Sequence, residues 1–195
     1  MTAKLKRGIT KVKDPGSALT HFIAMILAII AAIPLLSKAG HDSGHMRISA
    51  LAIFILSMIG LYAASTIYHT LDISPKINKL LRKIDHMMIF ILIAGTYTPV
   101  CMIVLGDKTG WTMLTLVWGI AIVGILINAL WITCPKWFSS LIYIAMGWVC
   151  ILAITKILSS MPRAGFMWLL AGGIIYTVGG IIYAMKLPFF NSRHR

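Results

Sequence analysis

The sequence predicts an all-α fold, a polytopic transmembrane helical bundle with six spans. Of its 195 residues, 59% are hydrophobic and only 12% are charged, and the mean hydropathy is +0.89. A soluble domain carries about a quarter charged residues. So few charges cannot cover a water-facing surface, so lipid must cover much of it. The charged residues also leave six uncharged runs of about 19 residues or more, each long enough to cross the hydrocarbon core as a helix.

The six runs define the expected domain organisation. A spanning segment must be helical, because lipid offers no partner to backbone N–H and C=O groups. We expect spans at about 17–37, 48–70, 85–106, 110–132, 137–156 and 164–185, within a bundle over 17–187. A basic leader, residues 1–16, precedes the bundle, and a short tail, residues 188–195, follows it.

The first and third runs carry features of their own. The run from Pro15 to Ser37 exceeds the apolar core of a usual signal peptide, and no clear small-x-small cleavage site follows it. We therefore expect an uncleaved anchor. In the third run, Gly95 and Pro99 predict a kink toward its outer half. Tyr97 and its two threonine neighbours are expected to satisfy the backbone groups that Pro99 frees.

The sixth run carries a pattern that favours close helix packing. Small residues and one tyrosine recur there at four-residue spacing: Gly172, Tyr176, Gly180 and Ala184. Small side chains let two helices approach closely in a membrane. We expect this face to pack within the bundle, and helix-mediated self-association is the alternative.

The basic residues predict the orientation of the bundle. The chain has 18 Lys and Arg against 5 acidic residues, all Asp, for a net charge of +13. With the amino terminus inside, 13 basic residues fall on the inner side and 5 on the outer side. The positive-inside rule then places both termini in the cytoplasm, with the bundle in the cell membrane. Nucleic-acid binding is not expected, because the basic residues lie between apolar spans rather than on one folded face.

This orientation gathers polar side chains at the cytoplasmic end of the bundle. Ser65 and His69 lie near the end of the second span, and Asp85 and His86 lie at the start of the third. His21 lies in the first turns of the first span. Ionisable residues within spans are costly, so each one is a candidate functional residue. The candidates share one membrane depth on three consecutive helices.

The chemistry of this group has two interpretations. Ser65 and His69 are four residues apart and share a helix face. A neutral imidazole is a good zinc ligand, Asp85 could hold a water or orient the ring, and a metal-bound water is a nucleophile near neutral pH. In the alternative, His69 and Asp85 lie at the membrane interface and pair with Arg82, Lys83 or lipid headgroups.

Two other sets of potential ligands are not expected to bind metal. His41 and His45 have the spacing of a helical zinc pair, but they lie in a glycine-containing outer loop, on the side opposite His69. Cys101, Cys134 and Cys150 lie in or beside apolar runs and lack zinc-type spacing, so we expect them to pack as small apolar residues.

Three motifs along the chain occur together in one known family. They are Leu19-Thr-His21, then Ser65-Thr-Ile-Tyr-His69-Thr70, and then Lys83-Ile-Asp85-His86 followed by Ala94-Gly-Thr-Tyr-Thr-Pro99. The set resembles the first three spans of the hemolysin III family, and the resemblance covers nearly the whole chain. This family is grouped with the progestin and adiponectin receptors and, more distantly, with the alkaline ceramidases.

The resemblance implies a seven-span fold with zinc near the cytoplasmic leaflet. By motif, His69 would be the zinc ligand from the second span, Asp85 would hold the zinc-bound water, and Ser65 would hydrogen-bond near the metal. The family's seventh span brings two further histidines as H-x-x-x-H, whereas this sequence ends at Arg195 with one tail histidine, His194. We therefore expect an incomplete zinc site with low occupancy or none, because such sites need about three protein ligands.

The function expected from these observations is a partial zinc-hydrolase-like site that acts on a lipid amide or a related substrate. Membrane lipids are the expected partners. The family resemblance also implies a pore-forming cytolysin, that is, a toxin, as an alternative, although no span shows the polar stripe of a water-filled pore. A non-catalytic membrane sensor is the third possibility.

Overall fold

The computed structural model describes residues 12–42, 44–131 and 136–185, and every element in these ranges is helical. The order is α1 (Pro15–Asp42), α2 (His45–Thr70), α3 (Pro75–Pro99), the π-helix η1 (Val100–Leu105), α4 (Lys108–Leu130), α5 (Lys136–Gly147), the 3-10 helix η2 (Trp148–Ala153), α6 (Ile154–Ser160) and α7 (Arg163–Met185). The predicted all-α class is confirmed. Most of the expected leader, 1–16, and the whole expected tail, 188–195, lie outside the described residues.

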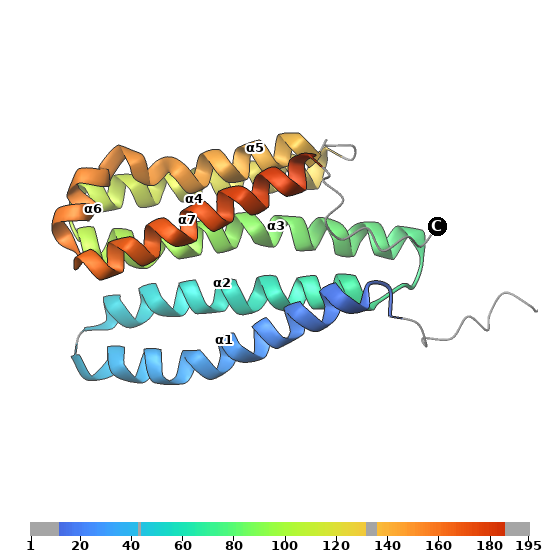
Figure 1. The fold of residues 1–195 in the computed structure, drawn as a ribbon, viewed down its shortest axis with the longest axis horizontal. Helices are drawn as coiled ribbons and strands as arrows, with labels where there is room; N and C mark the ends of the chain where they lie inside the picture. The colour runs from blue at the N-terminus through green and yellow to red at the C-terminus, as the bar shows by residue number, and fades with distance from the viewer. Residues whose placement is uncertain (1–11, 43, 132–135, 186–195) are drawn as a thin grey trace, which may run out of the picture.

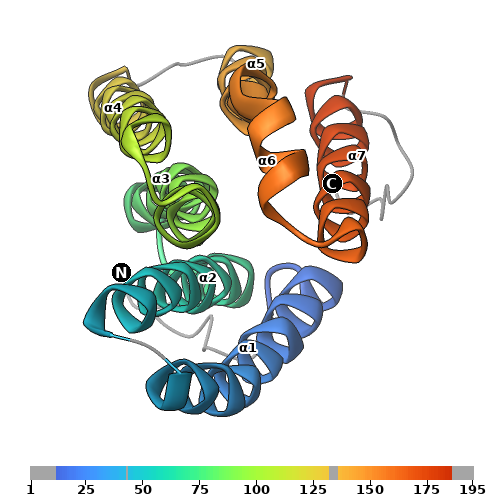
Figure 2. The same cartoon turned by 90° about the vertical axis from the view of Figure 1, so that its left-hand side faces the viewer.

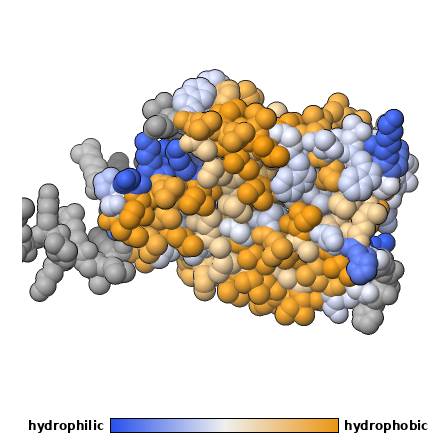
Figure 3. Space-filling model, turned by 180° about the vertical axis from the view of Figure 1, so that it is seen from behind, coloured by the Kyte–Doolittle hydropathy of each residue, from blue (hydrophilic) through white to orange (hydrophobic). Residues whose placement is uncertain are grey.

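The helices form six membrane-length rods that lie side by side (Figure 1). η1 continues α3, while η2 and α6 continue α5, so the described ranges contain six apolar helices long enough to span a membrane. Seen from behind in Figure 3, hydrophobic residues cover most of the flank, and hydrophilic residues gather toward the two ends. This distribution is that of a bundle whose sides face lipid.

α3 is the central helix of the bundle. In its most apolar window 44% of the residues are buried, against 6% for α1 and none for α7. Figure 2 shows α3 enclosed by α2 and α4, with α5 across from it. α3 starts well before the uncharged run, because Ser74 caps it by accepting the Ile77 N–H at 3.3 Å and Pro75 suits its first turn. The first turns of α3 therefore contain basic residues that precede the apolar run.

The core forms around one side chain of α3. Phe90 is fully buried, and its ring lies 4.5 Å from that of Tyr143 on α5, centroid to centroid. A Cβ at Gly124 on α4 would lie 2.3 Å from the Phe90 ring, and one at Gly95 would lie 2.2 Å from the Ser57 hydroxyl on α2. These glycines let α2 and α4 pack directly on α3.

The fifth span contains a break in its α-helical hydrogen bonding that Tyr97 bridges. The Tyr97 hydroxyl donates to the Gly147 carbonyl at 2.7 Å and accepts the Cys150 N–H at 2.9 Å, where α5 becomes η2. The prediction that Tyr97 serves the backbone beside Pro99 is therefore wrong, because its long side chain reaches the neighbouring helix. A side chain that inserts between the backbone hydrogen-bonding groups of a helix is a recognised cause of a helix irregularity.

Around Pro99, the third span has threonine side chains that bond to its own backbone and an irregular helix that follows. Thr96 and Thr98 donate to carbonyls one turn back, those of Leu92 at 2.8 Å and Ala94 at 2.9 Å. Beyond the proline, the helix widens into the π-helix η1 and ends at Gly106, whose φ of 60° suits a residue without Cβ. The irregular backbone thus follows Pro99 toward the end of the span.

A polar clamp joins the starts of α4 and α6 at the end of the bundle that carries Asp107, here called the Asp107 end. The Asp107 carboxylate accepts the Gly110 N–H at 3.1 Å, which caps α4, and it also accepts a hydrogen bond from Lys156. The Lys156 ammonium reaches the Thr109 hydroxyl at 3.0 Å. The bond from Lys156 is the main reason that the pKa of Asp107 lies below its ordinary value.

The Tyr97 bridge makes a stability prediction. Tyr97→Phe removes both hydrogen bonds at the α5–η2 junction and should lower the free energy of unfolding by about 1–3 kcal/mol, because two backbone groups lose their bridging partner. Unfolding of detergent-solubilised protein, followed by circular dichroism, measures this. Thr115→Ala is the control, since that exposed hydroxyl bonds only within its own helix. Equal stabilities for both variants would contradict the role assigned to Tyr97.

The Asp107 clamp predicts a dependence of stability on pH. Because the folded pKa is lowered, the carboxylate contributes fully above its ordinary pKa of about 4, and the contribution is lost as the pH falls through the lowered value. Asp107→Asn keeps a capping side chain but removes the charge. The melting temperature of this variant should lie below that of the original chain at pH 7, and the gap should close in acid. A gap that does not change with pH would refute this account.

Candidate functional site

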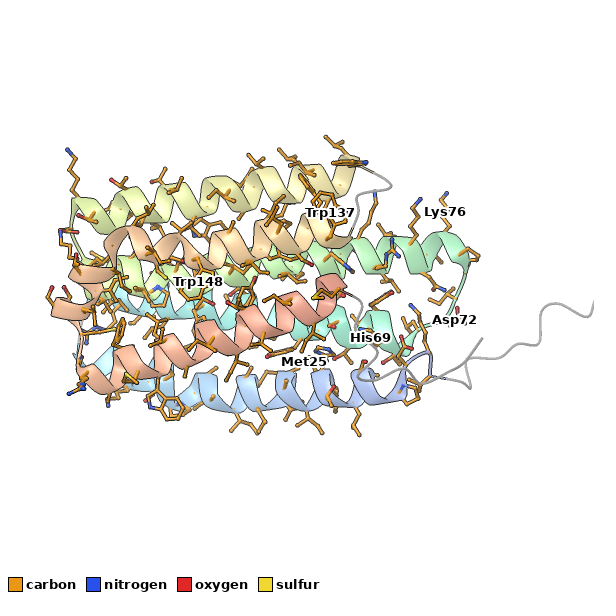
Figure 4. All side chains as sticks on the ribbon, turned by 45° about the horizontal axis from the view of Figure 1, so that its top comes forward. Met25, His69, Asp72, Lys76, Trp137 and Trp148 are labelled. Carbon is orange, nitrogen blue, oxygen red and sulfur yellow. The ribbon has the colours of Figure 1, made fainter. Side chains whose placement is uncertain are left out.

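The polar residues predicted to gather at one depth do lie together at one end of the bundle, here called the His69 end. The rings of His21 on α1 and His69 on α2 stack with centroids 5.7 Å apart and planes 5° apart. His21 also lies within electrostatic range of Asp85 on α3. Figure 4 shows His69 at this end, near Asp72 and well away from Trp148. His21 and His69 therefore meet at this end, and the Asp85 carboxylate acts on His21 electrostatically.

The sequence interpretation missed the partner of His69. Asp14 lies directly before α1, and its carboxylate oxygen is 3.0 Å from His69 Nδ1. Backbone bonds fix the approach, because the N–H groups of Lys13 and Asp14 donate to the carbonyls of Thr70 and His69, at 3.4 and 2.9 Å. In the sequence, Asp14 lies directly before the first uncharged run. Its position beside Pro15, at the start of a helix antiparallel to α2, was the available signal.

The Asp14 carboxylate orients the imidazole ring of His69. A carboxylate at Nδ1 favours the tautomer with the proton on Nδ1 and leaves the lone pair of Nε2 available as a base or metal ligand. Aromatic rings lie beside both histidines. The Tyr68 ring lies 4.8 Å from that of His69, and the Tyr62 ring lies 5.9 Å from that of His21, centroid to centroid. The imidazole is therefore oriented from one side and enclosed by rings on others.

The buried polar groups of α2 and α3 complete the cluster. Ser65 is 4% exposed and Asp85 is 9% exposed. The Asp85 carboxylate lies 3.8 Å from His86 Nδ1, which is itself 2.7 Å from the Arg82 carbonyl, while the Tyr143 hydroxyl donates to the His86 carbonyl at 2.9 Å. The contacts of His86 thus include the backbone of its own helix, whereas Asp85 is the buried carboxylate available to the cluster.

The alternative interpretation paired His69 and Asp85 with Arg82, Lys83 or lipid headgroups. The structure shows other partners for His69 and Lys83, and pairing with headgroups stays a prediction. His69 pairs with Asp14, and Lys83 donates instead to the Ala129 carbonyl at 2.8 Å, near the end of α4. A lysine that binds the last carbonyls of a helix compensates for groups without an intrahelical partner. Lys83 therefore joins α3 to α4 rather than neutralising Asp85.

The described residues fit a metal ion only in part. His69 has the carboxylate–imidazole arrangement typical of a zinc ligand. Across residues 12–42, 44–131 and 136–185, however, no three His, Cys, Asp or Glu side chains converge on one metal position. These residues alone do not supply the three ligands that a catalytic zinc needs. The other spaced pair is divided between helices, with His41 in the last turn of α1 and His45 the first residue of α2.

Comparison with known proteins identifies relatives over almost the whole chain. Residues 9–192 match the model of the family described as "Haemolysin-III related". The chain is 40% identical over 191 residues to "Hemolysin-3" of Bacillus cereus, covering 97% of this chain and 87% of that protein. It is 37% identical over 181 residues to "Hemolysin-3 homolog" of Bacillus subtilis (strain 168), covering 92% and 84% respectively. The chain thus belongs to the haemolysin-III family, and the part of it that the structure describes has the multi-pass character of six helices long enough to cross a membrane.

Proposed function

We propose that this haemolysin-III protein has a partial zinc-hydrolase-like site, made by Ser65, His69 and Asp85, that acts on a lipid amide or a related lipid substrate. The observation that carries the proposal is the contact of His21 with His69, which Asp14 orients, together with the electrostatic effect of the Asp85 carboxylate on His21. Such groups are costly inside a membrane bundle and are retained where they serve a function.

The proposed location of the site is the cytoplasmic leaflet of the cell membrane. The excess of basic residues on one side supports this orientation, with the amino terminus in the cytoplasm. In that orientation the His69 end is at the cytoplasmic surface and the Asp107 end is at the outer surface. A lipid substrate can then enter the site sideways from the inner leaflet, and its polar part can stay near water.

The residues of the cluster can divide the chemistry of hydrolysis among them. The Asp85 carboxylate accepts a proton from a water molecule, whose oxygen attacks the carbonyl carbon of the amide. The C–N bond breaks, and the proton held by Asp85 passes to the departing amine. Ser65 hydrogen-bonds near the reacting group, and Nε2 of His69 faces it. Zinc is the metal that the family resemblance implies, and His69 is the residue that would hold it.

The first test of this proposal is hydrolysis of a fluorogenic long-chain amide in proteoliposomes. Asp85→Asn and His69→Ala should each lower the rate by roughly 100-fold or more, because a positioned base contributes about that factor. Asp14→Asn should lower it by about 10-fold or more, since it acts only by orienting His69. His45→Ala, at the opposite end of the bundle, is the matched control and should keep the full rate.

The same preparations report on the metal. We expect zinc well below one ion per chain, because the described residues do not provide three convergent ligands. One zinc per chain that is lost in His69→Ala would show that residues outside the described ranges complete the site. Hydrolysis that is absent in the original chain, or that is unchanged in His69→Ala and Asp85→Asn, would reject the hydrolase proposal.

Membrane lysis is the second candidate, motivated by the names of the two Bacillus relatives. The described interior favours a packed bundle over a pore, since its fully buried side chains include Phe90, Val117 and Met146. We therefore expect liposomes that contain the chain to release no more of a small entrapped dye than empty liposomes do. Release that rises with the amount of protein would favour the pore-forming alternative. A chain that neither hydrolyses lipid nor releases dye would fit a sensor.

A further inference from the structure

The third span is longer than a membrane requires. The continuous helix from Pro75 to Leu105 has 31 residues, whereas the other five spans of the described chain have 20 to 26. A helix crosses the hydrocarbon core with about 20 residues, so roughly ten residues of this span lie outside the core. The basic residues of the span all lie in its first turns, so the excess is at that end. Figure 1 shows this start of α3 beyond the neighbouring ends of α4, α5 and α7.

These projecting turns, residues 75–84, have a basic face beside an apolar face. The basic residues recur at helical spacing: Lys76, Lys79, Arg82 and Lys83. Large apolar residues that are exposed recur at the same spacing: Ile77, Leu80 and Ile84. A helix with this pattern suits the headgroup layer of a membrane, because its apolar side chains can reach the acyl chains while its cations stay beside phosphate groups.

Aromatic residues indicate the same depth for this part of the molecule. Trp131, directly after α4, and Trp137, in the first turn of α5, are 47% and 59% exposed. Exposed tryptophans in membrane proteins gather at the level of the headgroups. In Figure 4, Lys76 lies farther toward the His69 end of the bundle than Trp137 does. The basic face of α3 is therefore at or just outside the headgroup layer.

The carboxylates at this end are engaged elsewhere. Asp14 pairs with His69, and Asp85 is buried beside His86. Asp72 accepts a hydrogen bond from the Asn78 amide at 2.7 Å, within the turn that leads into α3.

Three cations of the projecting turns thus have no carboxylate partner. Lys83 donates to the Ala129 carbonyl at 2.8 Å, so one cation of the basic face is already used to join α3 to α4. The other three, Lys76, Lys79 and Arg82, are exposed, and none of them forms an ion pair with a carboxylate of the described residues. Their charge is available to an anion from outside the chain.

We propose that the projecting turns of α3 bind the headgroup of an anionic phospholipid. The Arg82 guanidinium can hold two phosphate oxygens, and Lys76 and Lys79 supply further positive charge. The exposed apolar face, with Leu80 at its centre, lies against the acyl chains of the same lipid. A zwitterionic lipid is disfavoured, because its own cation repels the basic face. This site does not depend on the hydrolase proposal, since the two share no residue.

Native mass spectrometry of the full chain in a mild detergent tests this proposal by counting bound lipids. The probes are phosphatidylglycerol and phosphatidylcholine with identical acyl chains. The first phosphatidylglycerol should bind about tenfold more tightly than phosphatidylcholine, because each basic residue near an anionic surface contributes about fivefold. The triple variant Lys76→Gln/Lys79→Gln/Arg82→Gln should lose this preference. Glutamine keeps the helix propensity of these exposed positions, so the circular dichroism spectrum should not change.

The matched control removes the same charge from the opposite end of the bundle. It is the triple variant Lys38→Gln/Lys108→Gln/Arg163→Gln, in which all three positions are exposed. Lys38 lies in the last turns of α1, and Lys108 and Arg163 are the first residues of α4 and α7. This variant should keep the tenfold preference, since only the charges of α3 lie beside the apolar face. Equal losses in the two triple variants would show an effect of net charge alone and would overturn the proposal.

A soluble phosphate distinguishes a lipid from other anions. Glycerol 1-phosphate at the concentration of the lipid should displace no phosphatidylglycerol, because it lacks acyl chains for the apolar face. Ile77→Gln/Leu80→Gln should weaken both phospholipids by roughly tenfold, since each side chain loses an apolar contact. Displacement by glycerol 1-phosphate, a preference that survives in the α3 triple variant, or equal binding of the two phospholipids by the original chain would each reject the proposed site.

Discussion

Within the hydrocarbon core of a membrane, a backbone N–H or C=O group finds no water, so every such group must be paired inside the protein. This constraint accounts for the helical state of all described elements and for the way the irregular ones are arranged. Where the fifth span leaves the α-helical pattern, the Tyr97 hydroxyl receives the Cys150 N–H and supplies a donor to the Gly147 carbonyl. The break is possible because a neighbouring helix provides the missing partner.

The cost of charge in the same medium shapes the two ends of the bundle. At the Asp107 end, Lys156 and Asp107 pair with each other where the helices meet water. At the His69 end, Asp14 pairs with His69. Both pairs join segments distant in sequence, and each therefore positions helices as well as balancing charge. The His69 end differs because Ser65 and Asp85 add buried polar groups beside the pair, which is why the chemistry is assigned there.

The polar cluster and an aromatic cavity between α3, the α5–η2 junction and α7 divide the bundle into two environments. The cluster offers ionisable groups and the carboxylate–imidazole pair, which suit the attack of water on a carbonyl carbon. The cavity has apolar and aromatic walls without a charged side chain. α3 is the element common to both, with Asp85 near its middle and Tyr97 close to its end. A change in the packing of α3 would therefore affect both the polar cluster and the aromatic cavity.

The sequence by itself determined the membrane class, the number of apolar helices among the described residues and the family. These depend on the summed hydropathy of long runs and on local motifs such as Ser65-Thr-Ile-Tyr-His69-Thr70. It also placed His21, His69 and Asp85 at one depth. Only the tertiary structure decided that Asp14 holds His69, that Tyr97 crosses to Gly147, and that a cavity forms beside Tyr176. These contacts depend on the rotation of each helix about its axis. Spans that are apolar on every face carry little periodic signal of that rotation, so only packing reveals it.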